Sequence, residues 1–201
     1  MKAWHFCRNN RKLGYGDTRR VKTGRTYKVK GKLVLCKHGL HGSVNILDAL
    51  GYVRGEILCR VELGGEILKG KDKVVASERT VLWMLDCTKI LHEFACLCAE
   101  RGLKRNKITD PRCWDAIKIK RLWLKGEATD EQLAAAWSAA GDVMRDAAMN
   151  MVAWNAARLA SRLAARHTVA WSPSRNTSWR EERDWQNRTL LRMVRKERAK
   201  R

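Results

Sequence analysis

Through the first 86 residues, apolar side chains come in short β-prone runs separated by glycine-bearing turns. Turns such as Lys30-Gly31-Lys32 and Gly64-Gly65 favour chain reversal, because glycine tolerates backbone angles that other residues avoid. The pattern therefore predicts a small antiparallel or mixed sheet. Its strands are expected at Ala3–Cys7, Thr26–Val29, Leu33–Cys36, Glu56–Leu63 and Val74–Leu85.

One short helix is predicted to interrupt the sheet between residues 43 and 51. Ser43 is a suitable N-cap, and Gly51 stands where a C-terminal cap belongs. The apolar face of this helix consists of Val44, Ile46, Leu47 and Leu50.

After Asp86 the spacing of apolar residues becomes helical. The first helix of this half ends near Gly102, and its apolar face consists of Ile90, Leu91, Phe94, Leu97 and Cys98. A second helix is predicted from its N-cap Asp110, with Pro111 in the first turn, to Gly126.

A third helix is predicted to begin at Thr129, where Gln132 completes the spacing of a capping box, and to continue through Ala134–Ala165. Tryptophans recur through these helices among small residues. This pattern favours close helix packing with indoles in the core over a surface for stacking bases. The tryptophans are Trp114, Trp123, Trp137, Trp154 and Trp171.

Ser172-Pro173-Ser174 ends the helical pattern, because proline lacks the backbone donor. Ser178 and Glu181 then repeat the capping-box spacing before a final basic helix that reaches about Glu197. The predicted fold class is α+β, a small N-terminal β-rich unit with one short helix followed by a C-terminal helical bundle. The expected domains are residues 1–86, 87–171 and 172–201.

The charge balance indicates which class of binding partner the protein would attract. Lys and Arg number 42 against 21 Asp and Glu, a formal net charge of +21. Such a surface attracts phosphate backbones or other acidic partners over about 8 Å at physiological salt. A generally basic host or phage proteome is the alternative explanation for this charge.

Cysteine usage and hydropathy indicate the compartment. The seven cysteines are an odd number scattered through apolar runs, which favours reduced, buried thiols over a disulfide framework. No secretion-like start and no run of about 18 apolar residues occurs. We therefore expect a cytoplasmic protein that does not associate with membranes.

The densest positive segment runs from residue 8 to residue 37, with eleven Lys and Arg against one acid, Asp17. Tyr15, Tyr27 and Trp4 interleave with these cations and could stack on bases, although core packing is the expected place of Trp4 and Tyr27. The candidate nucleic-acid-binding residues here are Arg8, Arg11, Lys12, Arg19, Arg20, Lys22, Arg25, Lys28, Lys30 and Lys32.

A second basic segment, residues 175–201, holds ten Lys and Arg and four acids. Helical spacing would align four of its cations in a stripe beside apolar positions 190–194. Such a helix could lie on a groove, or dock on its own helical bundle with a solvated outer face. The four candidates are Arg188, Arg192, Arg195 and Lys196.

The residues that could carry chemistry are concentrated in Lys37–Ser43, the segment that connects a predicted strand to the predicted short helix. It contains the imidazoles of His38 and His41 and the hydroxyl of Ser43. His41 either acts in a site or bonds the backbone of its own turn. His92 and Cys96 are four residues apart on a predicted helix, but two ligands do not make a zinc site, and we expect structural thiols there.

Four segments of the first half together resemble a shortened core of the ADP-ribosyltransferase family. They are Ala3-Trp4-His5-Phe6, Gly39-Leu40-His41-Gly42-Ser43, Gly55–Gly64 and Ser77-Glu78-Arg79-Thr80-Val81-Leu82. The resemblance implies NAD as cofactor. It implies that His5 holds the nicotinamide ribose, that His41 stands near the nicotinamide ring, and that Glu78 orients the acceptor or stabilises positive charge at the ribose carbon.

The first half also resembles uncharacterised phage and prophage proteins. The shared features are a Leu-Cys-x-x-Gly-Leu-His-x-Ser run, here Leu35–Ser43, then Leu-Asp-Ala-Leu at Leu47–Leu50 and Val-Glu-Leu-Gly-Gly at Val61–Gly65. This resemblance implies a phage setting, in which small basic proteins often act on host nucleic-acid machinery or host defence.

The leading expectation is therefore a phage-type accessory protein without a cofactor. It would bind nucleic acid or a nucleoprotein complex through its basic surfaces, and could serve as a counter-defence, anti-CRISPR-like inhibitor. One alternative is an ADP-ribosyltransferase-like enzyme that uses NAD. Another is a protein-only module whose charge recognises an acidic host protein.

Overall fold

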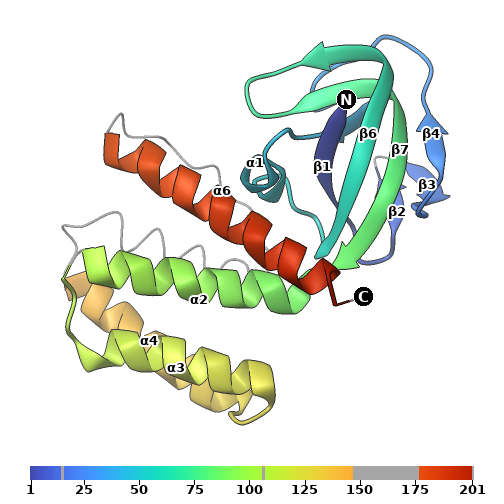
Figure 1. Cartoon of the computed structure of the whole chain (residues 1–201). Helices are drawn as coiled ribbons and strands as arrows, with labels where there is room; N and C mark the ends of the chain where they lie inside the picture. Colours follow the sequence, from blue (N-terminus) through green and yellow to red (C-terminus); the bar gives the residue numbers. More distant parts are fainter. Residues whose placement is uncertain (15, 106, 147–176, 201) are drawn as a thin grey trace. The chain divides into compact units, whose positions relative to one another are not determined.

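The computed structural model describes residues 1–14, 16–105, 107–146 and 177–200 (Figure 1). The fold is mixed, with an N-terminal antiparallel sheet followed by helices. The chain divides into two compact units, Met1–Thr88 together with Pro173–Arg201, and Lys89–Ser172. The final basic helix thus belongs to the same unit as the sheet.

The main sheet of the first unit is five-stranded and antiparallel. Its path runs β1-β6-β7-β4, and β5 pairs with β7 beside β4. A separate two-stranded ribbon pairs β2 with β3. The strands are β1 (Lys2–Cys7), β2 (Lys12–Gly14), β3 (Asp17–Arg20), β4 (Thr26–Lys28), β5 (Leu40–Gly42), β6 (Ile57–Lys69) and β7 (Val74–Asp86).

Because side chains alternate along a strand, the sheet has two distinct faces. On one face Leu63 of β6 lies opposite Arg79 of β7, which in turn lies opposite Tyr27 of β4. Leu63 and Tyr27 belong to a hydrophobic cluster of the unit. The buried members of that cluster are Ala3, Cys7, Val21, Tyr27, Leu40, Ile57, Cys59, Val61, Leu63, Val74, Ala76 and Val81.

On the other face Trp4, Arg60 and Trp83 stand in register across β1, β6 and β7. The Arg60 guanidinium carbon lies 4.3 Å from the centre of the Trp4 ring, and the two indoles meet edge to face at 5.7 Å. Arg198 of the last helix covers Trp83 at 4.7 Å. Trp4 therefore packs within the unit, as its sequence context predicts.

Two predicted features of the sheet are wrong. Residues Leu33–Cys36 form turns instead of a strand, apart from an isolated bridge between Val34 and His38. Gly64-Gly65 is not the hairpin turn, because β6 continues through it to Lys69 with a shift in register. Gly65 has a φ of +66°, and a Cβ there would lie 2.2 Å from Ser77 Oγ, so the site is a bulge that requires glycine.

The short helix α1 (Ile46–Leu50) forms as predicted with Gly51 at its C-cap, but Ser43 is not its N-cap. Asn45 precedes it without a side-chain cap, and Gly51 has a right-handed φ of −62°. Ser43 is instead buried beside β1, where its backbone N–H and C=O both bond Trp4, at 2.8 and 2.7 Å.

The last helix, α6 (Thr177–Arg198), packs against α1. Asn187 accepts a 3.4 Å hydrogen bond from the Leu47 N–H, and Arg183 forms an ion pair with Asp48. The described part of the helix starts at Thr177. Leu190 and Val194 of α6 are both buried.

The second unit contains α2 (Thr88–Arg105), α3 (Pro111–Lys125) and α4 (Asp130–Asp146). The predicted caps are confirmed. The Asp110 side chain accepts the Arg112 N–H, Gly126 adopts a left-handed φ of 79°, and Thr129 and Gln132 exchange the two bonds of a capping box. Helix α2 continues past Gly102, which lies buried within it.

A small cluster holds these helices together. It contains Cys96, Ala99 and Leu103 of α2 and Cys113 and Ile117 of α3, with Ala140 of α4 against it. The indoles of Trp114, Trp123 and Trp137 are half-buried. Trp154, Trp171, the predicted continuation to Ala165 and the break at Ser172-Pro173-Ser174 lie outside the described residues.

Candidate functional site

A pocket of about 270 Å³ opens in the first unit. It is lined by β1, by the β2–β3 ribbon, by the segment that leads through β5, and by β7. His5 and His41, two of the three residues that the transferase resemblance assigns to catalysis, both line it. The sheet therefore brings these imidazoles to one place from positions 36 residues apart in the sequence.

Arg79 is the buried charge of this pocket. Its side chain is only 2% exposed, and Nη1 donates a 2.8 Å hydrogen bond to the His41 carbonyl. Nε is buried and has no hydrogen-bond partner in the part of the chain that the structure describes. Burial lowers the pKa of Arg79, which expresses the cost of holding a guanidinium away from water.

His5 comes from β1, where it pairs with Cys59 of β6. Its pKa lies well below the ordinary value of 6.5, first because of burial and then because of the Arg79 charge and His41. His5 is therefore a neutral imidazole at pH 7, with one N–H donor and one nitrogen acceptor.

His41 has a structural partner in addition to its place in the pocket. Its Nε2 accepts a 3.0 Å hydrogen bond from the Cys36 N–H, and Cys36 has a left-handed φ of 66°. This bond requires a neutral ring, and burial lowers the pKa of His41 accordingly. The bond to its own loop agrees with the structural alternative for His41.

The rest of the pocket lining is strongly cationic. The Arg8 guanidinium lies against the backbone of the ribbon, so that a Cβ on Gly14 would stand 3.2 Å from Arg8 Nε. One carboxylate also lines the pocket, that of Asp17, and it already pairs with Arg19 at 2.6 Å. The cationic lining residues are Arg8, Lys37, Arg54, Lys73 and Arg79.

Glu78, the third residue implied by the transferase resemblance, is not among the lining residues of this pocket. It lies next to Arg79 on β7, and strand alternation turns the two side chains to opposite faces. Its carboxylate forms an ion pair with Lys28 of β4 at 2.7 Å. The structure thus brings His5 and His41 together and leaves Glu78 apart from them.

The N-terminal basic residues form a second candidate site, here called the basic surface. Nine of its ten members are exposed, and Arg8 is half-buried at the pocket. Among the described residues only Arg19 and Lys28 pair with carboxylates. The members are Arg8, Arg11, Lys12, Arg19, Arg20, Lys22, Arg25, Lys28, Lys30 and Lys32.

Buried Tyr27 gathers part of this surface around itself. Its hydroxyl donates to the Arg20 carbonyl and accepts the Lys22 N–H at 2.8 Å. The guanidinium carbons of Arg19 and Arg25 lie 5.8 and 5.4 Å from its ring centre. Tyr27 is therefore a core residue, as expected, and it holds several cations in one region. Tyr15 lies outside the described residues.

The four cations predicted on the last helix, Arg188, Arg192, Arg195 and Lys196, are all exposed on α6. The helix docks through α1 on the unit that contains the sheet, whereas the docking alternative named the helical bundle. Leu190 and Val194 of its apolar face are buried. Its cations are left on the solvated side.

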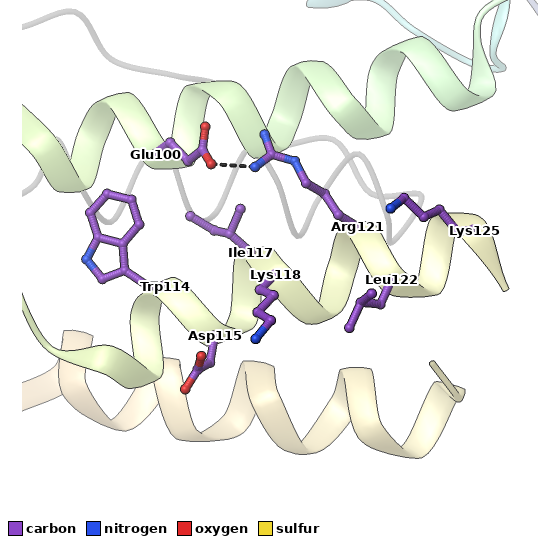
Figure 2. Close-up of a pocket in the computed structure, with 8 residues that line it drawn as sticks. All are labelled: Glu100, Trp114, Asp115, Ile117, Lys118, Arg121, Leu122 and Lys125. Carbon is purple, nitrogen blue, oxygen red and sulfur yellow. Dashed lines mark hydrogen bonds and ion pairs between the residues drawn. The ribbon is translucent and has the colours of Figure 1, made fainter. Parts of the chain in front are cut away.

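The second unit has an open groove of about 420 Å³ between α2 and α3 (Figure 2). Arg121 of α3 dominates it, bonding Glu93 at 2.8 Å and pairing with Glu100. Figure 2 shows Glu100 and Arg121 pointing toward one another. Arg121, Glu93 and Glu100 therefore balance one another's charge.

Helix α2 places His92 against the Trp123 ring, edge to face at 5.7 Å, and buries Cys96 in the cluster shared with α3. Burial raises the pKa of the Cys96 thiol to about 11. Among the described residues, no group of three or more His, Cys, Asp or Glu side chains is arranged to hold a metal ion. Likewise, no helix of the described chain is long and apolar enough to cross a bilayer.

Sequence reasoning missed Arg79 as a site residue, although it lies within a quoted motif. The sequence did contain a sign of this, because alternation along the strand puts Arg79 on the same side as the apolar Val81, which is expected to face the core. A buried charge at such a position needs a partner, either from the fold or from a ligand.

Comparison with known proteins adds one relationship. Residues 1–93 match the model of a family described as Domain of unknown function (DUF7666). No curated protein and no solved structure matches the chain significantly. The matched range contains every strand of the sheet unit and therefore both the pocket and the basic surface.

Proposed function

We propose that this protein binds nucleic acid, free or within a nucleoprotein complex, through the basic surface. The observation that supports this most strongly is exposure without neutralisation, since nine of these cations face solvent and only Arg19 and Lys28 have carboxylate partners among the described residues. Exposed cations without carboxylate partners can pair with the regular negative charge of a phosphate backbone. With the phage resemblance, they favour a host nucleic acid or nucleoprotein complex as the target.

The test compares two variants that lose the same charge from the same unit. In the surface variant Arg20, Lys22, Lys30 and Lys32 become Gln; in the control Lys2, Lys69, Lys71 and Arg180, all exposed on other elements, become Gln. Binding of fluorescent single-stranded DNA, duplex DNA and RNA is measured by anisotropy. We expect the surface variant to bind at least about tenfold more weakly than the control. Equal losses in both variants would contradict a dedicated surface.

A second candidate function is ADP-ribosyl transfer from NAD, because His5 and His41 share one pocket. In this alternative the two histidines would hold the nicotinamide end of NAD. Incubation with labelled NAD and host lysate tests it, with His5→Gln and Glu78→Gln as variants. Transfer that is lost in both variants would support this function, and absence of transfer by the unaltered protein would remove it.

The third candidate, recognition of an acidic host protein, shares the same cations. A pull-down with and without nuclease separates it from nucleic-acid binding, because a protein partner would survive digestion.

We also propose that the second unit is a helical bundle, since α2, α3 and α4 contribute to one hydrophobic cluster.

A further inference from the structure

Arg79 is a buried positive charge, and no salt bridge to it is found among the described residues. A buried guanidinium normally faces a carboxylate, because an unpaired ion away from water costs several kcal/mol. Arg79 has one bond to a neutral carbonyl and an unpartnered Nε, and its side chain is 98% removed from solvent. A counter-charge supplied from outside would remove this cost.

The surroundings of Arg79 indicate the charge of that missing partner. Five cationic side chains line the pocket against the single carboxylate of Asp17, which is already engaged by Arg19. Even without Arg54, four cationic side chains line the pocket, so a monoanionic carboxylate would balance only part of their charge. A phosphomonoester carries about −1.5 to −2 at pH 7 and offers three acceptor oxygens, which suits several donors at once.

The geometry points to a binding site for a phosphomonoester in this pocket, with the phosphate on Arg79 and the neutral His5 imidazole as a further donor. The pocket shares only Arg8 with the basic surface, and the phosphate is assigned to Arg79 and His5, so the two proposals can be tested separately. Arg8 and Lys73 lie at the same pocket and would add long-range attraction.

The size of the pocket limits the ligand. Drug-sized ligands occupy pockets of about 300–1,000 Å³, and this one has about 270 Å³. A phosphate with a small organic portion fits, whereas only part of a dinucleotide would be enclosed. The apolar lining at Leu13, Val29 and Leu40 is available to that organic portion.

The experiment titrates the full-length protein with inorganic phosphate, AMP, adenosine and a 5′-phosphorylated dinucleotide, using calorimetry at physiological ionic strength. We expect binding of the phosphorylated probes and none of adenosine. Preference for inorganic phosphate, for AMP or for the dinucleotide would identify the source as the free ion, a mononucleotide or a nucleic-acid end. Equal binding of AMP and adenosine, or no binding at millimolar concentration, would overturn the proposal.

Arg79→Gln is expected to weaken AMP binding at least about tenfold, because it removes a charged hydrogen-bond donor. Arg180→Gln, an exposed change of equal charge in the same unit, should leave it unaltered. The surface variant should also keep AMP binding, and Arg79→Gln should keep binding of 5′-hydroxyl oligonucleotides, so the two proposals fail independently.

A further measurement covers the case in which Arg79→Gln does not fold. In the unaltered protein, the His5 ring proton is followed by NMR against pH with and without AMP. A phosphate on Arg79 should raise the pKa of His5, because it offsets the positive field at that ring. An unchanged His5 titration at saturating AMP would place the ligand elsewhere and overturn the assignment.

Discussion

Arg79 Nη1 donates a 2.8 Å hydrogen bond to the carbonyl oxygen of His41, joining β7 to β5 inside the pocket. The bond satisfies one backbone acceptor but leaves the guanidinium charge uncompensated. Residues that serve binding are often kept at a cost in stability. The effect of Arg79 on the free energy of unfolding shows whether its hydrogen bond to His41 or its uncompensated charge matters more for stability.

Arg79→Met replaces the buried charge with an apolar chain of similar reach. Removing an unpaired buried ion should offset the loss of one hydrogen bond, so we expect the free energy of unfolding to stay level or rise by about 1 kcal/mol. Urea unfolding followed by tryptophan fluorescence measures it. A loss of more than about 2 kcal/mol would show that Arg79 is mainly a structural tie to β5.

The lowered pKa of His5 makes stability depend on pH. Below the ordinary value of 6.5 the unfolded chain binds a proton at this residue while the folded chain does not, so stability should fall as pH falls. The pKa of His41 is lowered too and adds a change of the same sign. Each histidine contributes at most about 1.4 kcal/mol per pH unit.

His5→Gln should therefore lose less stability than the unaltered protein between about pH 7.5 and pH 5. Thermal unfolding across that range measures the difference, and His38→Gln, which changes an exposed ring, is the matched control. Identical pH profiles for the His5 variant and the unaltered protein would contradict the lowered pKa.

Thiol reactivity should single out Cys36. It is the exposed member of the seven cysteines, and its Sγ accepts a 2.7 Å hydrogen bond from Lys73 Nζ. The other six are buried, and burial raises the pKa of Cys96 to about 11. A chromogenic disulfide reagent at pH 8 should titrate one thiol rapidly and the others only on unfolding. Cys36→Ser should abolish the rapid phase; its persistence would contradict this assignment.

The capping box at the start of α4 should contribute measurably to the second unit. Thr129→Ala removes the side-chain acceptor for the Gln132 N–H, and we expect it to cost about 1 kcal/mol of unfolding free energy. Ser138→Ala, at an exposed position within α4, should cost nothing, since alanine favours the helix. Similar losses from both changes would mean that the cap is not formed in solution.

Local signals predicted much of the helical structure. Asp110 with Pro111 marks the start of α3 and Gly126 its end, because these residues satisfy the free backbone groups of a helix locally. The predicted strand at Leu33–Cys36 was wrong because these β-prone residues have no partner strand in the sheet. The strand that pairs with β7 at this edge is β5. Strand pairing is a long-range property that short-range composition does not contain.

The candidate site was predictable only in part. His5 and His41 stood out because imidazoles are chemically conspicuous, and they line one pocket. Arg79 did not, because its meaning depends on which face of β7 it occupies and on what lies across that face. Glu78, one residue away, was chosen from a motif, and the alternation of the strand turns it toward Lys28.

The salt dependence of nucleic-acid binding tests the central claim most directly. Affinity for a 5′-hydroxyl single-stranded oligonucleotide is measured from about 50 to about 200 mM salt, and its logarithm is plotted against that of the salt concentration. Four or more phosphate contacts by the basic surface give an expected slope of about −3 or steeper, reduced in the surface variant. A flat plot, or one unchanged by that variant, would contradict the account.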